Sequence, residues 1–363
     1  MKILILANND VGLFKFRKEL LERLLKDGNE VLISLPFGSF VEDMTKMGCT
    51  FIETPIQRRG TNPITDLKLL KRYDEMIRKY QPDTVLSYTI KPNVYGGLAC
   101  QKNRIPYIAN VTGLGSAVEN GGLMQKITVF LYRMGLRKAD TVFFQNEANR
   151  DFMIRQGVVK DNYRLIPGSG VNLNQYSYMP YPVHETIDFV YVGRLMKEKG
   201  FDLYASAAEK IRKEYPYTRF HVCGDYEDNY KERVEELVKN DVIIYHGLVD
   251  KMTDIYEKID CTIHPTYYPE GMSNVLLESL ACGRPIITTD RPGCREIVDD
   301  KVNGFVVRQN DEEDLVEKIR IFIGLSAEER KQLGLNGRKK VEEQFDRNIV
   351  INEYLRAIEK AVK

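Results

Sequence analysis

The sequence has 363 residues, of which 43% are hydrophobic and 29% are charged, a composition typical of a globular protein and not of a disordered or fibrous one. A chain of this length exceeds what one ordinary hydrophobic core fills, so two domains are expected. No apolar run reaches the length of a membrane-spanning helix, and polar residues (Asn8, Asn9, Asp10) soon follow the apolar start. These features exclude a signal peptide or a membrane anchor and predict a cytoplasmic protein.

The net charge of +1 hides an asymmetry between the two halves of the chain. Residues 1–165 carry 25 Lys and Arg against 17 Asp and Glu, a balance of +8, and the remainder has a balance of −7. Either the first half meets an anionic partner, such as a phosphate group or a membrane surface, or the asymmetry is chance variation among solvated faces. The cations are not clustered with aromatic residues, so nucleic acid is not expected as a partner. The cysteines and histidines lack the spacing of a metal site, so no metal is expected.

Strands alternate with helices from the start of the chain. Residues 2–7 form an apolar run bounded by polar residues, which predicts a buried parallel strand, and residues 14–27 show helical spacing closed by Gly28. Further strands are predicted near residues 30–34, 49–53, 83–87, 106–109, 140–144 and 163–166. This alternation indicates a parallel sheet covered by helices on both faces.

A second domain of the same kind follows a connector rich in Pro and Gly at residues 167–185. Strands are predicted near residues 187–193, 218–223, 241–244, 260–264 and 285–289, again with helices between them. The last stretch is helical, over residues 311–323, 326–344 and 347–361. The final helix has an apolar stripe and is therefore expected to pack on one of the two domains.

The strongest functional pattern lies at the strand-to-helix junction in residues 264–278. A helix is predicted to begin near Ser273, which can cap it and leave the amides of Asn274 and Val275 pointing at the crevice beyond the sheet. Such a helix start suits a diphosphate. Glu270 and Glu278 would repel a phosphate, so they suit sugar hydroxyls better.

Two cations follow the first strand of the second half, at Arg194 and Lys199. Placed at the same sheet edge, they would neutralise a departing nucleoside diphosphate without metal. The first junction of the chain contains only Gly12 as a position for close backbone approach, without the GxGxxG of a dinucleotide site. In the first half, Lys91 and Asn93 are predicted at a helix start. The helix at 122–138 is either a buried core helix or a surface that grips a lipid tail.

Together these motifs resemble the retaining glycosyltransferases of family four, which have the α/β fold called GT-B. The resemblance implies two Rossmann-like domains with parallel sheets facing across a cleft, and a C-terminal helix that crosses back to the first domain. Residues 1–168 with helix 347–363 would be the acceptor-binding domain, and residues 169–346 the nucleotide-sugar-binding domain. By this resemblance the catalytic residues are Glu270, Arg194 and Lys199. The donor-binding residues are Glu278, Gly271, Ser273, Asn274, Val275 and Gly12, with Gly12 letting the first domain close over the donor.

Three segments of the first half, residues 89–97, 112–116 and 144–147, are similar to bacterial members that act on polyprenyl-diphosphate-linked sugars. The resemblance implies a UDP-sugar donor, a polyprenyl-diphosphate-linked acceptor and peripheral contact with an anionic membrane at its inner face. Lys91, Asn93 and Arg17 would bind the acceptor, with Lys91 and Arg17 on its phosphates. Many family members place a histidine in the first domain near the donor sugar, but here the first histidine is His184.

The resulting hypothesis is a retaining transfer of a hexose or an N-acetylhexosamine from a UDP-sugar to a lipid-linked saccharide. One alternative is a GT-B nucleotide-sugar epimerase, which needs no acceptor. Another is a non-catalytic nucleotide-sugar-binding subunit, which the four charged residues of the predicted donor site argue against.

Overall fold

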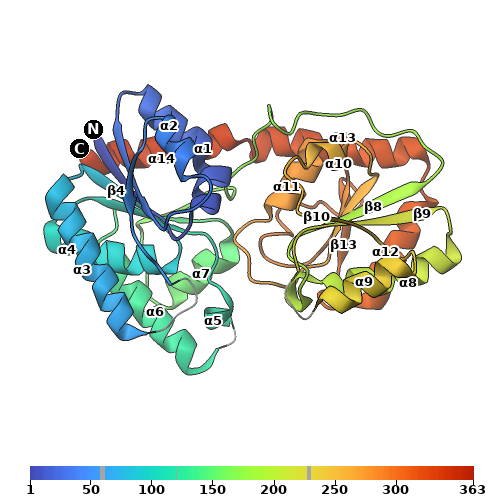
Figure 1. Cartoon of the computed structure of the whole chain (residues 1–363), viewed down its shortest axis with the longest axis horizontal. Helices are drawn as coiled ribbons and strands as arrows, with labels where there is room; N and C mark the ends of the chain where they lie inside the picture. Colours follow the sequence, from blue (N-terminus) through green and yellow to red (C-terminus); the bar gives the residue numbers. More distant parts are fainter. Residues whose placement is uncertain (58–61, 120, 227–229) are drawn as a thin grey trace. The chain divides into compact units, whose positions relative to one another are not determined.

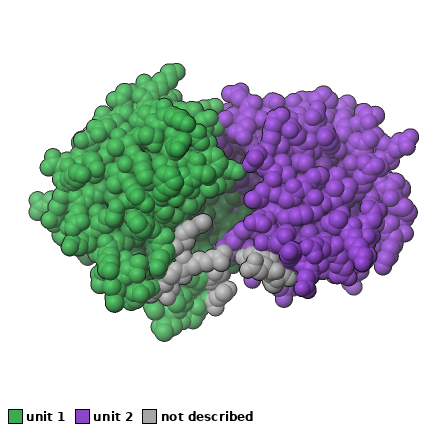
Figure 2. Space-filling view, in the orientation of Figure 1, with its two compact units in different colours: residues 1–169, 269–272, 348–363 green, residues 170–268, 273–347 purple. Residues whose placement is uncertain are grey.

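The computed structural model describes residues 1–57, 62–119, 121–226 and 230–363 (Figure 1). The chain forms two compact units, coloured separately in Figure 2. The first comprises Met1–Ser169, Pro269–Met272 and Asn348–Lys363, and the second comprises Gly170–Tyr268 and Ser273–Arg347. Each unit is built on one parallel sheet, so the predicted α/β class with two parallel-sheet domains is confirmed.

The sheet of the first unit has seven parallel strands in the order β3-β2-β1-β4-β5-β6-β7. The strands are β1 (Lys2–Leu6), β2 (Glu30–Leu35), β3 (Thr50–Glu53), β4 (Thr84–Tyr88), β5 (Tyr107–Val111), β6 (Thr141–Phe144) and β7 (Tyr163–Leu165). The strand order reverses direction between β1 and β4, which pair directly. Open parallel sheets bind ligands beyond the carboxyl ends of the strands at such a switch point.

Helices cover both faces of this sheet because both faces are apolar. In β1, Ile3 and Ile5 enter one core while Leu4 and Leu6 enter the other, and all four are fully buried. One face is covered by α3 (Pro63–Tyr80), α4 (Gly97–Asn103) and α6 (Gly122–Leu136). The other is covered by α1 (Asp10–Lys26), α2 (Val41–Lys46) and the C-terminal helix α14 (Arg347–Val362). The remaining helical segments are the π-helix η1 (Pro92–Gly96), α5 (Ser116–Glu119) and α7 (Glu147–Arg155).

The sheet of the second unit has six parallel strands in the order β10-β9-β8-β11-β12-β13. These are β8 (Ile187–Val192), β9 (Thr218–Cys223), β10 (Ile244–Gly247), β11 (Cys261–His264), β12 (Ile286–Thr289) and β13 (Gly304–Val307). The helical segments are η2 (Lys197–Lys199), α8 (Phe201–Glu214), α9 (Lys231–Lys239), α10 (Thr253–Tyr256), α11 (Asn274–Ala281), α12 (Glu312–Gly324) and α13 (Ala327–Gln344). The switch point of this sheet lies between β8 and β11, which also pair directly.

Three differences from the predicted elements matter for the site. Helix α1 begins at Asp10 instead of residue 14, because the side chain of Asn9 caps it by accepting from the amide of Gly12 at 2.6 Å. Strand β10 is shifted by three residues, to Ile244–Gly247. Strand β13 was not predicted; its apolar run, Phe305 to Val307, is only three residues long and follows a glycine.

A glycine contact joins α4 to α6, and it leads to a testable prediction about stability. A Cβ on Gly97 would lie 2.1 Å from the carbonyl oxygen of Gly135, an oxygen that also accepts from the hydroxyl of Tyr107. Gly97→Ala is therefore expected to lower the free energy of unfolding by about 3 kcal/mol, since a backbone group must move. Urea denaturation tests this: we expect a lower midpoint, while the slope of the free energy of unfolding against urea concentration stays unchanged.

The matched control is Gly324→Ala at the end of α12, where an added methyl meets nothing within 4 Å among the described residues. An equal urea midpoint for Gly97→Ala and the control would contradict the glycine contact.

Candidate functional site

The two loops that flank the β8–β11 switch point carry most of the predicted donor-site residues. The loop after β8 contains Arg194 and leads through η2, which contains Lys199. The loop after β11 leads to α11, whose N-cap position is Ser273. Because β8 and β11 are neighbours in the sheet, both loops emerge at the same edge.

Backbone contacts hold the two loops together. The carbonyl oxygen of Glu198 accepts from the amide of Tyr267 at 2.9 Å and from the hydroxyl of Thr266 at 3.3 Å. Gly200 has a φ of 78°, and a Cβ there would lie 2.2 Å from the carbonyl oxygen of Pro265. A glycine is therefore required on both conformational and steric grounds at the end of η2.

Arg194 and Lys199 lie over the same aromatic ring. The guanidinium carbon of Arg194 is 5.9 Å and the ammonium nitrogen of Lys199 is 5.0 Å from the ring centroid of Tyr268. Both distances are within the range of cation–π contacts. The structure thus brings these two predicted cations together beside the loop that leads to α11, and their contact with a diphosphate stays a prediction.

The start of α11 is a helix end without a capping side chain. Ser273 occupies the N-cap position as predicted, but its hydroxyl makes no capping bond. Within the described residues, the Ser273 Oγ and the Asn274 Oδ1 are buried and have no hydrogen-bond partner. The amide of Ser273 donates to the carbonyl oxygen of Gly293 at 2.8 Å. The amide of Ser273, which was predicted to bind the donor, is therefore engaged within the protein, and the amides of Asn274 and Val275 are left to face an anion.

Glu278 lies within α11 and is half-buried. Its carboxylate accepts a hydrogen bond from the phenol of Tyr176. Burial, followed by the charge and hydrogen bond of Glu278, raises the pKa of Tyr176 well above its usual value, so the phenol stays protonated and remains a donor. The sequence analysis did not predict this contact with Tyr176, which lies in the connector between the two sheets.

Glu270 lies on a four-residue segment, Pro269–Met272, that packs within the first unit. The side-chain amide of Asn146, which follows β6, donates to the carbonyl oxygens of Glu270 at 3.2 Å and Gly271 at 2.6 Å. A Cβ on Gly271 would lie 2.3 Å from the carbonyl oxygen of Thr112. The position of Gly271 is thus set by close backbone approach, whereas its contact with a donor stays a prediction.

Asn146 is a positioning residue that the sequence reasoning did not assign a role. Its Oδ1 caps α7 by accepting from the amide of Asn149 at 2.9 Å, while its Nδ2 holds the segment that carries Glu270. An Asn directly after a predicted strand and before a helix was the available signal, because a side chain there lies at the ligand-binding edge of the sheet.

The acceptor-site predictions fare differently in the first unit. Asn93 is fully buried, accepting from the Ser87 hydroxyl at 2.8 Å and donating to the carbonyl oxygen of Asn110 at 2.8 Å. Arg17 is nearly buried, with its guanidinium over the rings of Tyr88 and Tyr354. Both side chains serve the framework, so the structure does not place them where an acceptor reaches them.

Lys91 and Gly12 also have partners inside the protein. The ammonium of Lys91 is 2.7 Å from a carboxylate oxygen of Asp66 and is mostly buried. An acceptor phosphate would have to compete with that carboxylate. Gly12 lies in the first turn of α1 with its amide bound to Asn9, rather than in an open loop. The amide of Gly12 is therefore already hydrogen-bonded to Asn9 and does not support the predicted role of Gly12 in closing over a donor.

The first unit has a strained residue at its own switch point. Thr89, directly after β4, has a φ of 72°, a left-handed conformation that is costly for a β-branched residue. Its hydroxyl is buried without a hydrogen-bond partner among the described residues, and the π-helix η1 follows. Strained residues and π-helices cluster at functional sites, so Thr89 is a candidate site residue that was not predicted from the sequence. No sequence signal predicts a positive φ at a threonine.

Comparison with known proteins identifies the family on both halves of the chain. Residues 2–146 match the family described as glycosyl transferase 4-like, and residues 182–340 match the glycosyl transferases group 1. An N,N'-diacetylbacillosaminyl-diphospho-undecaprenol alpha-1,3-N-acetylgalactosaminyltransferase from Campylobacter jejuni is 24% identical over the whole of both chains. The capsular polysaccharide biosynthesis glycosyltransferase CapM from Staphylococcus aureus is 28% identical, covering 82% of this chain and 81% of CapM.

Solved structures show the same architecture. A glycosyltransferase from Rickettsia africae has a TM-score of 0.82 at 20% identity, covering 100% of this chain and 98% of its own. Anabaena Alr3699/HepE, solved with UDP-glucose, has a TM-score of 0.80 at 20% identity over 98% of this chain and 100% of its own. The predicted GT-B fold is thereby confirmed. The chain is thus a glycosyltransferase whose first half belongs to the glycosyl transferase 4-like family and whose second half belongs to the glycosyl transferases group 1.

Proposed function

We propose that this glycosyltransferase moves a hexose or an N-acetylhexosamine from a UDP-sugar to a polyprenyl-diphosphate-linked saccharide, with retention of the anomeric configuration. One observation carries the donor half: two cations lie beside the loop that leads to an uncapped helix start at the β8–β11 switch point. The names of the Campylobacter and Anabaena proteins, which include an undecaprenol-linked acceptor and a UDP-glucose complex, support the two substrates.

The charged residues divide the work of donor binding. Arg194 and Lys199 stabilise the negative charge that grows on the leaving diphosphate, together with the amides at the start of α11. One well-placed donor of this kind contributes about 3–4 kcal/mol to the transition state. Glu278 accepts from the ribose hydroxyls, and Glu270 accepts from the hydroxyls of the transferred sugar.

The transfer step balances without a protein nucleophile. The acceptor hydroxyl oxygen bonds to the anomeric carbon on the face from which UDP leaves, while the bond between that carbon and the diphosphate oxygen breaks. The bonding electrons leave with UDP, and a phosphate oxygen of the departing UDP takes the proton of the acceptor hydroxyl. Front-face attack of this kind retains the configuration.

The first unit takes the acceptor in this proposal, and the second takes the donor. The positive balance of the first half suits a diphosphate lipid and an anionic membrane, which the protein contacts peripherally at the cytoplasmic face. Among the described helices none is long and apolar enough to cross a membrane. We propose no metal, because the two cations supply the positive charge that a metal ion would otherwise bring to the diphosphate.

A donor screen tests this function directly. The protein is incubated with each UDP-sugar and a short polyprenyl-diphosphate-linked saccharide, and nucleotide release is followed while NMR assigns the anomeric configuration of the product. We expect acceptor-dependent UDP release, an α-linked product from an α-linked donor, and an unchanged rate in EDTA. Epimerised donor in the absence of acceptor would favour the epimerase instead. Donor binding without any turnover would favour the non-catalytic subunit.

A further inference from the structure

Helix α6 has apolar side chains on its solvent-exposed face as well as on the face that packs into the core. Leu123, Ile127, Phe130 and Met134 are exposed by 75%, 43%, 55% and 40%, respectively. Their spacing of four, three and four residues places them on one stripe of the helix. The opposite side packs into the sheet through Val129, Tyr132 and Leu136. We call Leu123, Ile127, Phe130 and Met134 the α6 stripe. An exposed apolar patch of this kind marks an interaction surface.

Basic residues flank the α6 stripe, and acidic residues are absent from α6. Lys126 and Arg133 precede Ile127 and Met134 by one residue each, so they lie beside the stripe on the same side. Arg137 continues that row one turn after Arg133. A helix with this arrangement lies in the plane of an anionic membrane surface, with its apolar face at the acyl boundary and its cations among the headgroups.

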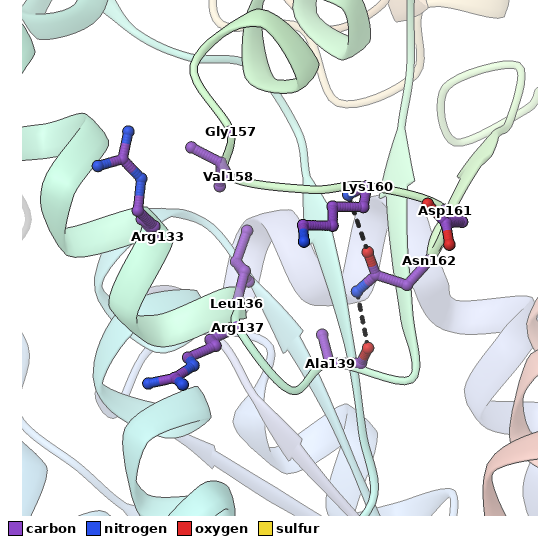
Figure 3. A pocket seen from close by; sticks show the side chains of 9 residues that line it. All are labelled: Arg133, Leu136, Arg137, Ala139, Gly157, Val158, Lys160, Asp161 and Asn162. Atoms are coloured by element: carbon purple, nitrogen blue, oxygen red, sulfur yellow. Dashed lines mark hydrogen bonds between the residues drawn. The ribbon is translucent and has the colours of Figure 1, made fainter.

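A surface pocket of about 330 Å³ opens at the C-terminal end of α6. Three cations line it: Arg133 from the last turn of α6, Arg137 from the residue that follows α6, and Lys160 from the loop between α7 and β7 (Figure 3). Leu136 and Val158 form its apolar wall. Helix-dipole complementarity accounts for arginines in the last turn of α6 but not for a lysine brought from another loop.

Of the four charged side chains that line the pocket, three are positive. In Figure 3 the ammonium of Lys160 points toward α6, whereas the carboxylate of Asp161, which also lines the pocket, points away from it. One terminal nitrogen of Arg133 donates to the carbonyl oxygen of Gln156, which orients the guanidinium and leaves its other donors for a ligand. Within the described parts of the chain, neither Arg137 nor Lys160 is paired with a carboxylate.

We propose that this pocket binds the phosphate of a membrane phospholipid headgroup while the α6 stripe enters the acyl boundary beside it. Three cations line one pocket beside an apolar helix face, and this combination favours an anionic phospholipid over a soluble anion, because a soluble anion would make no contact with the stripe. The inference deepens the proposed function, on which it rests for the choice of a membrane as the partner, and it names the surface that docks.

Vesicle co-sedimentation of the full-length protein tests the proposal without any sugar transfer. The probes are vesicles with phosphatidylglycerol and vesicles of phosphatidylcholine alone. The pocket variant is Arg137→Gln with Lys160→Gln, and the stripe variant is Ile127→Ser with Phe130→Ser. The control, Lys331→Gln with Lys339→Gln on α13, removes the same charge from exposed positions of the second unit.

We expect the pocket variant to bind phosphatidylglycerol vesicles about 20-fold more weakly than the wild type, since each cation near an anionic surface strengthens binding about fivefold. The stripe variant is expected to lose binding to both vesicle types, while the control binds like the wild type. Thermal unfolding checks that each variant is folded.

Three results would overturn the proposal. If the pocket and stripe variants bind vesicles as well as the control does, neither part of the proposed surface binds the membrane. Inorganic phosphate that displaces the protein from vesicles at concentrations near its own affinity would make the pocket a soluble-anion site. Wild-type self-association that Phe130→Ser abolishes would assign the stripe to a second copy. Vesicle binding that holds in a protein without transferase activity would refute the proposed function and leave this inference intact.

Discussion

Lys199→Ala is expected to lower kcat by about 100-fold or more, because a positive group aimed at developing negative charge contributes most in the transition state. The ammonium of Lys199 lies 5.0 Å from the ring centroid of Tyr268, beside the loop that leads to α11. A charge lost there leaves the departing diphosphate with one cation, Arg194, and the helix start. Initial rates of UDP release over a range of donor concentrations separate kcat from KM.

Lys197→Ala is the matched control, since Lys197 belongs to the same short helix η2 and is exposed. It removes an equal charge from the same backbone, so it is expected to keep the wild-type kcat. The double variant of Arg194 and Lys199 should lose less than the product of the two single effects, because both cations act on one diphosphate in the proposed mechanism. A folded Lys199→Ala protein with near-normal turnover would refute the diphosphate assignment.

The order of strands and helices could be predicted from the sequence because each element has a simple pattern. Strand β1 is an apolar run because both of its faces are buried, and α14 shows its stripe because one side packs into the first core. Strand β13 has an apolar run of only three residues after a glycine, which is too short to be distinguished from a buried turn or helix end. Helix α1 begins early because the cap is a side chain, Asn9, that looks like any other loop asparagine in the sequence.

The donor-site residues were predictable where chemistry and strand order coincide. Arg194 and Lys199 follow β8 and α11 follows β11, so the two cations and the start of α11 lie at one edge of the sheet once the strand order is known. The acceptor-site residues were predicted from charge and position alone, and two of them, Asn93 and Arg17, are buried in the structure. Whether Asn93 or Arg17 points outward depends on tertiary packing, namely on η1 and on the tyrosines of β4 and α14.

Gly271→Ala is expected to lower kcat/KM by about 100-fold while UDP still binds. An added Cβ would lie 2.3 Å from both the carbonyl oxygen of Thr112 and the side-chain oxygen of Gln145, so the segment must move away from its support. That segment carries Glu270, which must lie within hydrogen-bond distance of the transferred sugar, and a shift of about 1 Å is enough to lose this contact. The two cations lie on the loop after β8, which the substitution does not touch, so UDP binding should persist.

The pair of readouts makes this prediction specific. Calorimetric titration with UDP reports on the cations and the start of α11, and steady-state transfer reports on the position of Glu270. Asn146→Ala removes the amide that holds the carbonyl oxygens of Glu270 and Gly271, so it should show the same split between UDP binding and transfer, to a smaller extent. Gly324→Ala, which adds a methyl group on α12 without a neighbour among the described residues, should change neither readout. If Gly271→Ala loses as much UDP affinity as transfer activity, the segment also binds the nucleotide. That result would contradict a separate role of Glu270 on the sugar.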